Sequence, residues 1–443
     1  MTPFDPCEPP AARPQRLSRR ALLAGCAAAL ISPVAARAAL RQSVDLDHRL
    51  REAARTGAAV RLPPGVVALR GLDLPDGATL IGAPGGTTLR SIGQGPLFRA
   101  GLARKITLES LILDGGGGHL GRDEALIEFT DVFDYAIHGC VFRNSPGHGV
   151  KMLRSGGRFT QSVVERIANA GFHSLDGLGV DFDGNHVRDC GDNGVMIWTT
   201  SAGRHEGSRL RNNRIEDIRN VSGGVGAYGN GVSVWGSGGL RVENNTIRRC
   251  AYTAVRNNSG HDMIVRGNDC KTFGEKAMYA EFGAKRSTFA DNRIDDCGAG
   301  IVVTNADSGT DGGVVTGNVV TGMSPRRPDH MFGPEMGWLI GLEGEKNCEI
   351  SGNTVVGPGW IGVALGGWRD NVRAEDNRLE NLDYGIVMAT GADAGRAVIA
   401  RNRITGARKA AIAATAGPTF LPGDLATTGS TDAKVTVRDN EVK

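Results

Sequence analysis

Three side chains are suited to acid–base chemistry on a charged sugar: Arg256, Lys276 and Tyr279. Enzymes that cleave or epimerise a uronate polymer need a cation to neutralise the sugar carboxylate and a base to remove the C5 proton. Arg256 suits the first role, and Lys276 or Tyr279 suits the second after a shift in pKa. These residues therefore predict a polysaccharide lyase or an epimerase, with a hydrolase less favoured.

Two tryptophans fall at the same position in successive units of a repeat. Alternation with apolar neighbours points both outward, where flat aromatic faces make good platforms for sugar rings. Four more residues share the same two outward rows. The predicted substrate-binding residues are Trp198, Trp235, Asn258, Glu281, His173 and Lys151. The predicted partner is a polysaccharide, and an acidic one because Arg256 lies beside these residues.

The same residues also suit a protein without catalytic activity. Tryptophans can cover loops, and Arg256 and Glu281 on adjacent coils can form an ordinary solvated contact. A glycan-binding protein or a structural repeat protein of the cell envelope would then use the same face. If the protein is an enzyme, replacing Arg256, Lys276 or Tyr279 would abolish turnover and leave binding intact. A non-catalytic protein has no turnover to lose.

A tenfold repeat must position these residues. Each unit has a polar turn, an asparagine, any residue and an aliphatic residue, followed by a second apolar strand. The repeated asparagines are Asn185, Asn213, Asn245, Asn268, Asn292, Asn318, Asn353, Asn377, Asn402 and Asn440. Their shortest spacing is 23 residues, and period-two apolar runs fill the units, which predicts a stacked β-solenoid. With three weaker units upstream, about thirteen coils are expected, and the asparagines should bond from coil to coil.

The second strand of each unit predicts the core, because alternate residues of a strand point to the same side. The residues expected inside are Val195, Ile197, Val232, Val234, Ile301, Val303, Val363, Leu365, Ile386 and Met388. Intervening coils separate the cysteines that share one core stack, which puts them beyond disulfide reach. We expect buried, reduced thiols at Cys140, Cys190, Cys250, Cys270, Cys297 and Cys348.

A short amphipathic helix is expected over residues 44–57, with Asp45 as its N-cap and Gly57 as its C-terminal stop. It would cover the first coil. Residues 60–65 (VRLPPG) and 74–82 (LPDGATLIG) follow it. In these features the chain resembles the pectin-lyase-like superfamily of right-handed parallel β-helices. The resemblance implies an all-β fold, a single-stranded right-handed parallel β-helix, in one domain over residues 39–443.

Residues 1–38 have the features of a twin-arginine export signal. Arg19 and Arg20 precede an apolar stretch that is too short to span a membrane, and residues 36–38 offer a cleavage site. We therefore expect export by the Tat machinery, already folded, to the periplasm or beyond, with no transmembrane segment. Residues 23–26 also match a lipoprotein processing box, which makes lipidation of Cys26 an alternative.

This signal together with the repeat resembles a family of twin-arginine-exported bacterial repeat proteins within the same superfamily. That resemblance implies no established activity. Basic and acidic residues balance once residues 1–38 are set aside, so a nucleic-acid partner is not expected.

Other groups suggest different chemistry. Asp181 and Asp183 are suited to Ca²⁺, although arginines at the same height in neighbouring coils favour a ladder of ion pairs; no other cofactor is expected. Residues 147–149 (GHG) and 191–194 (GDNG) are similar to motifs of polygalacturonase-type hydrolases. Their order is reversed, and the carboxylate pair needed for hydrolysis is not visible.

Three insertions border the second strands, at residues 199–209, 219–229 and 322–336. Long loops on a repeat scaffold are where binding sites usually lie, so we expect them to form the walls of a groove. An outward apolar stripe offers a homo-oligomer contact instead. That stripe consists of Leu153, Leu175, Met196 and Val302.

Overall fold

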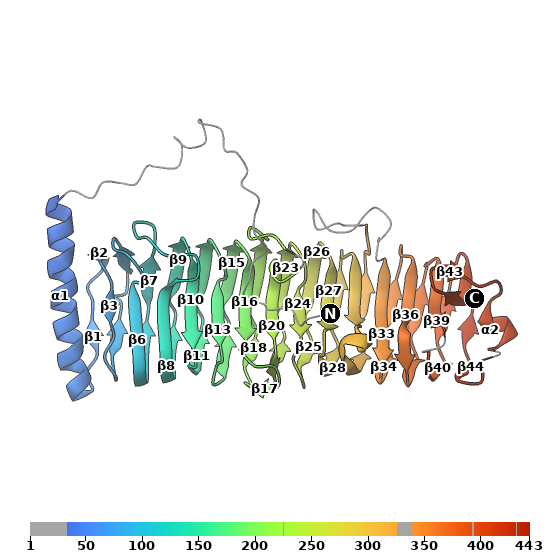
Figure 1. The fold of residues 1–443 in the computed structure, drawn as a ribbon. Coiled ribbons are helices and arrows are strands. Elements are labelled where there is room, and N and C mark those ends of the chain that lie inside the picture. Colours follow the sequence, from blue (N-terminus) through green and yellow to red (C-terminus); the bar gives the residue numbers. More distant parts are fainter. Residues whose placement is uncertain (1–32, 225, 326–338, 392–393, 431) are drawn as a thin grey trace, which may run out of the picture.

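The chain winds into a right-handed parallel β-helix of about 14 turns (Figure 1). The computed structural model describes residues 33–443 except 225, 326–338, 392–393 and 431. Its strands pair in parallel between successive coils, apart from one short antiparallel pair near the C-terminus. The predicted fold class is confirmed. No helix within this described part is long and apolar enough to cross a membrane.

Each regular coil contributes one strand to each of three faces. The first face consists of β10 (His148–Leu153), β13 (Phe172–Leu175), β16 (Asn193–Trp198), β20 (Asn230–Trp235), β24 (Val255–Asn258), β27 (Lys276–Glu281), β30 (Ala299–Val303), β33 (Ile340–Lys346), β36 (Ile361–Asp370), β39 (Tyr384–Thr390) and β42 (Ala410–Ala416). The second face consists of β11 (Gly157–Thr160), β14 (Val180–Asp183), β18 (Arg209–Arg211), β22 (Arg241–Glu243), β25 (Ile264–Arg266), β28 (Lys285–Ala290), β31 (Asp311–Thr316), β34 (Cys348–Ser351), β37 (Val372–Glu375), β40 (Ala397–Ala400) and β44 (Val435–Arg438).

The third face is a separate sheet of 15 strands. It consists of β2 (Gly65–Leu69), β5 (Thr87–Ser91), β7 (Leu111–Asp114), β9 (Val141–Ser145), β12 (Val163–Ile167), β15 (His186–Cys190), β19 (Arg214–Ile218), β23 (Thr246–Cys250), β26 (Asp269–Phe273), β29 (Arg293–Asp295), β32 (Val319–Thr321), β35 (Thr354–Val356), β38 (Arg378–Glu380), β41 (Arg403–Thr405) and β45 (Glu441–Val442). The first coils are completed by β1 (Val60–Arg61), β3 (Leu72–Asp73), β4 (Thr79–Ile81), β6 (Phe98–Glu109) and β8 (Ala125–His138). Short elements outside the three faces are β17 (Arg204–His205), β21 (Ser237–Gly238), β43 (Thr419–Phe420), a 3₁₀ helix η1 (Ala306–Ser308) and α2 (Leu425–Thr428).

The repeated asparagines form a continuous ladder at the turn between the second and third faces. From Asn185 to Asn440, each side-chain Nδ2 donates to Oδ1 of the next asparagine at 2.9–3.1 Å. Nδ2 also donates to a backbone carbonyl of the preceding coil, as from Asn292 to Val265 at 3.0 Å. The predicted coil-to-coil bonding is confirmed. It satisfies amides that would otherwise be buried without partners.

The residue before each ladder asparagine has a positive φ, between 55° and 66°. Glycine reaches this left-handed region without steric cost, and asparagine and aspartate tolerate it. That requirement explains the polar turn in the repeat. Arg401, with φ of 55°, takes the same conformation with a bulkier side chain.

The core runs the whole length of the tube. Every residue predicted to point inward is buried, from Val195 to Met388. The six cysteines from Cys140 to Cys348 are also buried and make no disulfide, as expected. Burial raises the pKa of Cys140 to about 12, so its thiol stays protonated.

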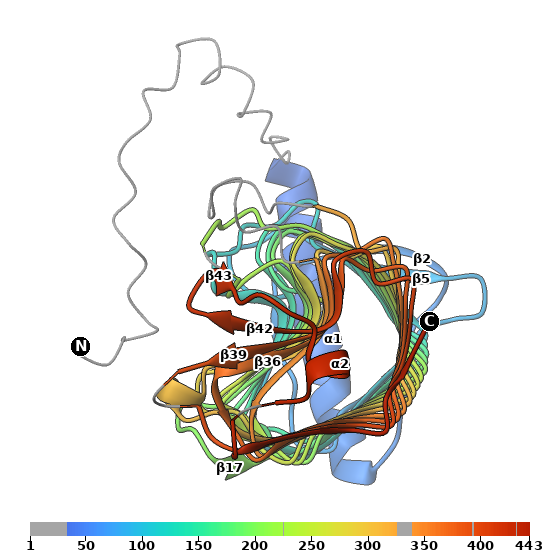
Figure 2. The same cartoon turned by 90° about the vertical axis from the view of Figure 1, so that its right-hand side faces the viewer.

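The helix at the N-terminal end is longer than expected. It is α1 (Pro33–Thr56), so Asp45 lies inside a helix and the prediction of Asp45 as N-cap is wrong. The alanine-rich segment before Asp45 favours helix, and proline is tolerated in a first turn. Leu46 and Leu50 are buried against the first coils. In the end-on view α1 crosses one end of the tube (Figure 2).

The predicted export signal lies largely outside the described residues. Residues 1–32, which include the twin arginines and Cys26, are not described. The predicted cleavage site at residues 36–38 falls within α1. Export and cleavage stay predictions.

Candidate functional site

The two predicted outward rows are present on the first face. Strand register aligns Lys151, His173, Met196, Ser233, Arg256, Tyr279 and Val302 in the first row. It aligns Leu153, Leu175, Trp198, Trp235, Asn258 and Glu281 in the second row. The sequence pattern therefore brings the predicted site residues together on one face.

The first row is largely buried, contrary to the expectation of solvent-facing side chains, whereas the second row is partly exposed except at Glu281. His173 and Arg256 are each 8% exposed, Tyr279 is 7% exposed and Glu281 is 1% exposed. Met196 and Val302 are buried as well, so the outward apolar stripe proposed as an oligomer contact is largely covered within the chain. Tyr279 and Val302 are buried against each other and Ala299, and His173 packs against His148 and Trp198, whereas an inserted loop covers Arg256.

Two loops far apart in sequence meet over the first face. Nη2 of Arg122 donates a hydrogen bond of 2.5 Å to Oγ of Ser222. The Lys151 ammonium donates to the carbonyl oxygen of Asp123 at 2.8 Å. Gly226 packs so closely on Arg256 that a Cβ there would lie 1.8 Å from Nη1. The insertion at 219–229, apart from residue 225, thus covers part of the first face at Arg256; most of the insertion at 322–336 lies outside the described residues.

The three predicted catalytic residues belong to one buried charge cluster. Arg256 Nε donates to Glu281 Oε1 at 2.6 Å, and Nη1 donates to Glu275 Oε2 at 3.2 Å. The Lys276 ammonium donates to Glu275 Oε1 at 2.9 Å and lies 4.1 Å from the centre of the Tyr279 ring. Two glutamates therefore already compensate both cations.

The pKa shifts in this cluster follow from burial and these partners. Burial alone would lower the pKa of Arg256, but Glu281 and Glu275 outweigh it and raise that pKa. Burial, together with Glu281, raises the pKa of the Tyr279 hydroxyl far above its usual range. Tyr279 therefore keeps its proton and donates to Asn305 Oδ1 at 3.2 Å, which favours it as a donor over a base.

Trp198 and Trp235 face each other in register at the ends of β16 and β20, and both are half-buried. Nε1 of Trp198 donates to Ser233 Oγ at 3.1 Å. The His173 and Trp198 rings pack edge to face, with their centres 5.8 Å apart. Asn258 continues this row, and its Oδ1 accepts from Ser259 Oγ at 2.8 Å.

His173 is held neutral. Burial lowers the pKa of His173 well below its usual value, with His148 as the next cause. The two rings lie 5.2 Å apart, and burial lowers the pKa of His148 to about 4. His148 is hydrogen-bonded within the chain, since its Nδ1 accepts from the backbone N–H of Ala170 and its Nε2 lies 3.3 Å from Asn169 Nδ2.

A cavity of about 240 Å³ opens beside this cluster, on the side of the C-terminal coils. Its lining is formed by Lys276, Tyr279, Thr304, Asn305, Asp307, Glu343, Glu345 and Trp368. Oε2 of Glu343 is buried there with no hydrogen-bond partner among the described residues. Burial and the nearby Glu345 raise the pKa of Glu343 to about 7, against the opposing effect of Lys276. A carboxyl group with that pKa can both take up and release a proton near neutral pH.

Glu343 was not among the residues predicted from sequence. It pairs with Val302 in register and therefore continues the first row by one coil. Extending the row across the long interval between Asn318 and Asn353 would have found it. Residues 342–345 alternate in the same way as the earlier second strands, which places Glu343 at an outward position.

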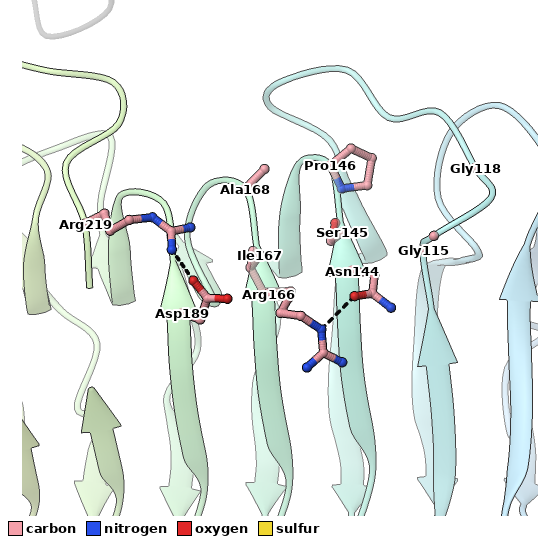
Figure 3. A pocket seen from close by; sticks show the side chains of 11 residues that line it. Gly115, Gly118, Asn144, Ser145, Pro146, Arg166, Ile167, Ala168, Asp189 and Arg219 are labelled. Carbon is pink, nitrogen blue, oxygen red and sulfur yellow. Dashed lines mark hydrogen bonds and ion pairs between the residues drawn. The ribbon is translucent and has the colours of Figure 1, made fainter. Parts of the chain in front are cut away.

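A second, shallower depression of about 540 Å³ lies at the turn between the third and first faces (Figure 3). Arg219 forms an ion pair with Asp189, and Arg166 Nε donates to Asn144 Oδ1 at 2.8 Å. Both arginines are paired, so the depression offers no free charge among its described lining residues.

The alternative chemistries gain little from the structure. Asp181 accepts from Arg211 at 2.7 Å, as expected of an ion ladder, and Asp183 accepts from Asn212 at 2.8 Å. Across the described ranges, no group of three or more His, Cys, Asp or Glu residues is arranged to hold a metal ion. Asp192 of the GDNG segment accepts from the backbone N–H of Ser222 at 2.8 Å and so supports the covering loop. Calcium binding stays a prediction.

Comparisons with known proteins agree with this architecture. The sequence model of the family described as right handed beta helix region matches residues 125–224 and 204–327. No curated protein matches the sequence. Among solved structures, PfbA, a surface adhesin of Streptococcus pneumoniae, is 11% identical with a TM-score of 0.53, covering 90% of this chain and 96% of its own.

Two further structures are similar to the same extent. The tailspike protein gp49 from Pseudomonas phage LKA1 is 12% identical with a TM-score of 0.51, covering 83% of this chain and 76% of its own. A PL6 alginate lyase in complex with a trisaccharide is 11% identical with a TM-score of 0.50, covering 91% of this chain and 93% of its own. At these identities the likeness concerns the fold. The chain thus has the right-handed parallel β-helix fold.

Proposed function

We propose that this chain binds a polysaccharide along the outer surface of the first face and acts on it at the cavity that contains Glu343. The observation that carries the proposal is the carboxyl group of Glu343: its Oε2 is buried without a hydrogen-bond partner in the described part of the chain, and its pKa is raised to about 7. Lys276 and Tyr279 line the same cavity. The names of the similar structures, an adhesin, a tailspike and an alginate lyase, support a sugar polymer as the partner.

The chemistry that fits this cavity begins with proton removal by Glu343. Its carboxylate takes the C5 proton of a uronate, which makes a carbanion beside the sugar carboxyl group. In a lyase the electron pair then forms the C4–C5 double bond, the C4–O bond breaks, and the leaving oxygen takes a proton from Tyr279 or Lys276. In an epimerase the abstracted proton stays on Glu343, and Tyr279 or Lys276 delivers another proton to C5 from the opposite side.

A second candidate is a non-catalytic glycan-binding or cell-envelope protein. It is favoured by the ion pairs of Arg256 and Lys276 with Glu281 and Glu275. Compensated in this way, Arg256 is not free to neutralise a substrate carboxylate. The finer proposals are that the polymer is acidic and that the chain is exported by the twin-arginine pathway as a member of a family of such repeat proteins; residues 18–23 and 36–38 support export.

One experiment separates these candidates. The purified chain is incubated with polymannuronate and with polygalacturonate in D₂O. A lyase produces unsaturated uronates that absorb in the ultraviolet, an epimerase incorporates deuterium at C5 without absorbance, and a binding protein does neither. Glu343→Gln should abolish either activity and keep binding. Glu349→Gln, at an exposed position on β34, serves as the matched control and should behave as the wild type.

Each outcome decides between the candidates. Activity that Glu343→Gln abolishes supports the enzyme. Binding without absorbance or deuterium supports the binding protein and excludes the lyase and the epimerase for these polymers. No binding to either polymer overturns the acidic-polysaccharide proposal.

A further inference from the structure

A bulge interrupts the first face one coil beyond Glu343. Gly344 pairs with Leu365 and Lys346 pairs with Asp370. One residue of β33, Glu345, therefore lies opposite four residues of β36, namely 366–369. Such a bulge redirects side chains away from the regular sheet. Trp368 lies within it and is 48% exposed.

The bulge is held in place by a buried arginine. Arg369 has no exposed surface. Its Nε donates to the Ala389 carbonyl oxygen at 2.9 Å, Nη1 donates to the Gly395 carbonyl oxygen, and Nη2 lies 3.4 Å from Asp432 Oδ2. Gly366 permits the close approach to Glu345, because a Cβ there would lie 2.6 Å from its Cγ. Trp368 is thus presented from a fixed platform.

The second row continues as far as Glu345, which lines the same cavity as Trp368. Glu281 aligns with Asn258 and Trp235. The residue before it, Ala280, aligns with Val303, which aligns with Gly344. Glu345, the residue after Gly344, therefore takes the position of Glu281 two coils further on. Trp368 faces Glu345 across the bulge. Trp198 and Trp235 therefore lie at one end of this row, and Trp368 lies beside its other end, at the C-terminal edge of the cavity.

We infer that Trp368 is a sugar-binding platform at the C-terminal edge of the cavity, so that the polymer lies lengthwise over the second row and is held on both sides of the coil that carries Glu343. The inference rests on the proposed function and adds the mode of binding. From β20 to β36 there are five steps between paired strands, or roughly 24 Å at the usual ~4.8 Å per coil. That length accommodates several sugar rings, and action on such a polymer occurs at internal residues.

The test compares oligosaccharides of different length. Trimers and octamers of mannuronate, of galacturonate and of glucose are titrated into the full chain, into Trp368→Ala and into Trp360→Ala. Trp360 is the matched control: it is 37% exposed, precedes the same strand at its other end and packs against Phe420 with ring centres 5.8 Å apart. Unfolding temperatures of all three proteins are measured alongside.

The wild type should bind the octamer of its preferred sugar at least about ten-fold more tightly than the trimer, since aromatic contacts of this kind dominate sugar and interface binding. Trp368→Ala should lose most of that gain with an unchanged unfolding temperature, and Trp360→Ala should keep it. If both variants keep the tighter binding of the octamer, or if both lose it equally, the inference is overturned while the proposed function stands. If the wild type binds none of the sugars, the proposed function fails and the inference fails with it.

Discussion

Nε of Arg256 lies 2.6 Å from Oε1 of Glu281 on the neighbouring coil, and both side chains are almost completely buried. Glu275 binds the same guanidinium and the Lys276 ammonium. The charges of the predicted catalytic residues are therefore balanced within the protein. Substitutions in this cluster will change stability as well as function, and the two effects must be measured separately.

Replacing Arg256 by methionine should destabilise the fold by about 3–5 kcal/mol, because it leaves buried carboxylates without their cation. The double substitution Arg256→Met/Glu281→Gln should recover part of the loss, since it removes one of those carboxylates. Urea unfolding of both variants and the wild type measures this. A single-variant loss below about 1 kcal/mol would show that water, and not Arg256, compensates Glu281.

Replacing Asn292 by alanine should cost about 2–4 kcal/mol. The change removes the acceptor of Asn268 Nδ2 and of its backbone N–H, and the donor to Asn318, all at 2.9–3.0 Å. Buried groups left without partners carry the full cost of desolvation. The control is Asn371→Gly, which removes an exposed bond of 2.9 Å to Asn347, keeps the positive φ of that position without strain, and should change the unfolding free energy by less than about 0.5 kcal/mol. Equal losses in the two variants would contradict a special role for the buried ladder.

Glu206 makes stability depend on pH. It is 6% exposed, accepts from Ser174 Oγ at 3.0 Å, and burial raises its pKa from 4.5 to about 7. Because the folded pKa is raised, this contribution to stability is fully present below pH 4.5 and is lost as the pH rises through 7. Glu206→Gln should therefore be more stable than the wild type above pH 7, by about 1–3 kcal/mol.

Unfolding temperatures across this pH range measure the effect of Glu206. The difference between Glu206→Gln and the wild type isolates it from His148 and His173, whose lowered pKa values act in the acid range. A difference that stays constant between pH 4.5 and 7 would show that Glu206 is charged in the folded protein throughout.

Glu343 should make binding and turnover respond to pH in opposite directions. Below about 7 its carboxyl group is protonated and can donate to a uronate, whereas the carboxylate formed above 7 repels it. Binding of an acidic polymer should weaken by about ten-fold as the pH rises through 7, while kcat/KM rises because the base is deprotonated. Titration calorimetry and rate measurements at several pH values test this. If binding to Glu343→Gln still weakens as the pH rises through 7, a group other than Glu343 causes the pH dependence.

The sequence predicts everything that the repeat itself encodes. The ladder asparagines, the inward residues such as Val195 and Met388, and the register of both outward rows follow from a period of two within strands and a constant position within coils. Trp198 and Trp235 fall opposite each other for that reason.

What the sequence did not predict comes from segments outside the repeat. The contact between Arg122 and Ser222 joins loops 100 residues apart, and nothing in the period indicates that they meet; the burial of Arg256 follows from such coverage. Trp368 lies within a bulge, where counting by the repeat loses register. Glu343 keeps its register with Val302, but the long interval before it hides the match.

The existence of the groove is best tested by a glycan-array binding screen of the purified chain beside a Trp198→Ala/Trp235→Ala double variant. Selective binding to uronate polymers that the double variant loses, although its circular dichroism spectrum still shows a folded protein, is the expected result. Binding that survives in the double variant, or the absence of binding to any glycan, would contradict a sugar-binding surface on the first face.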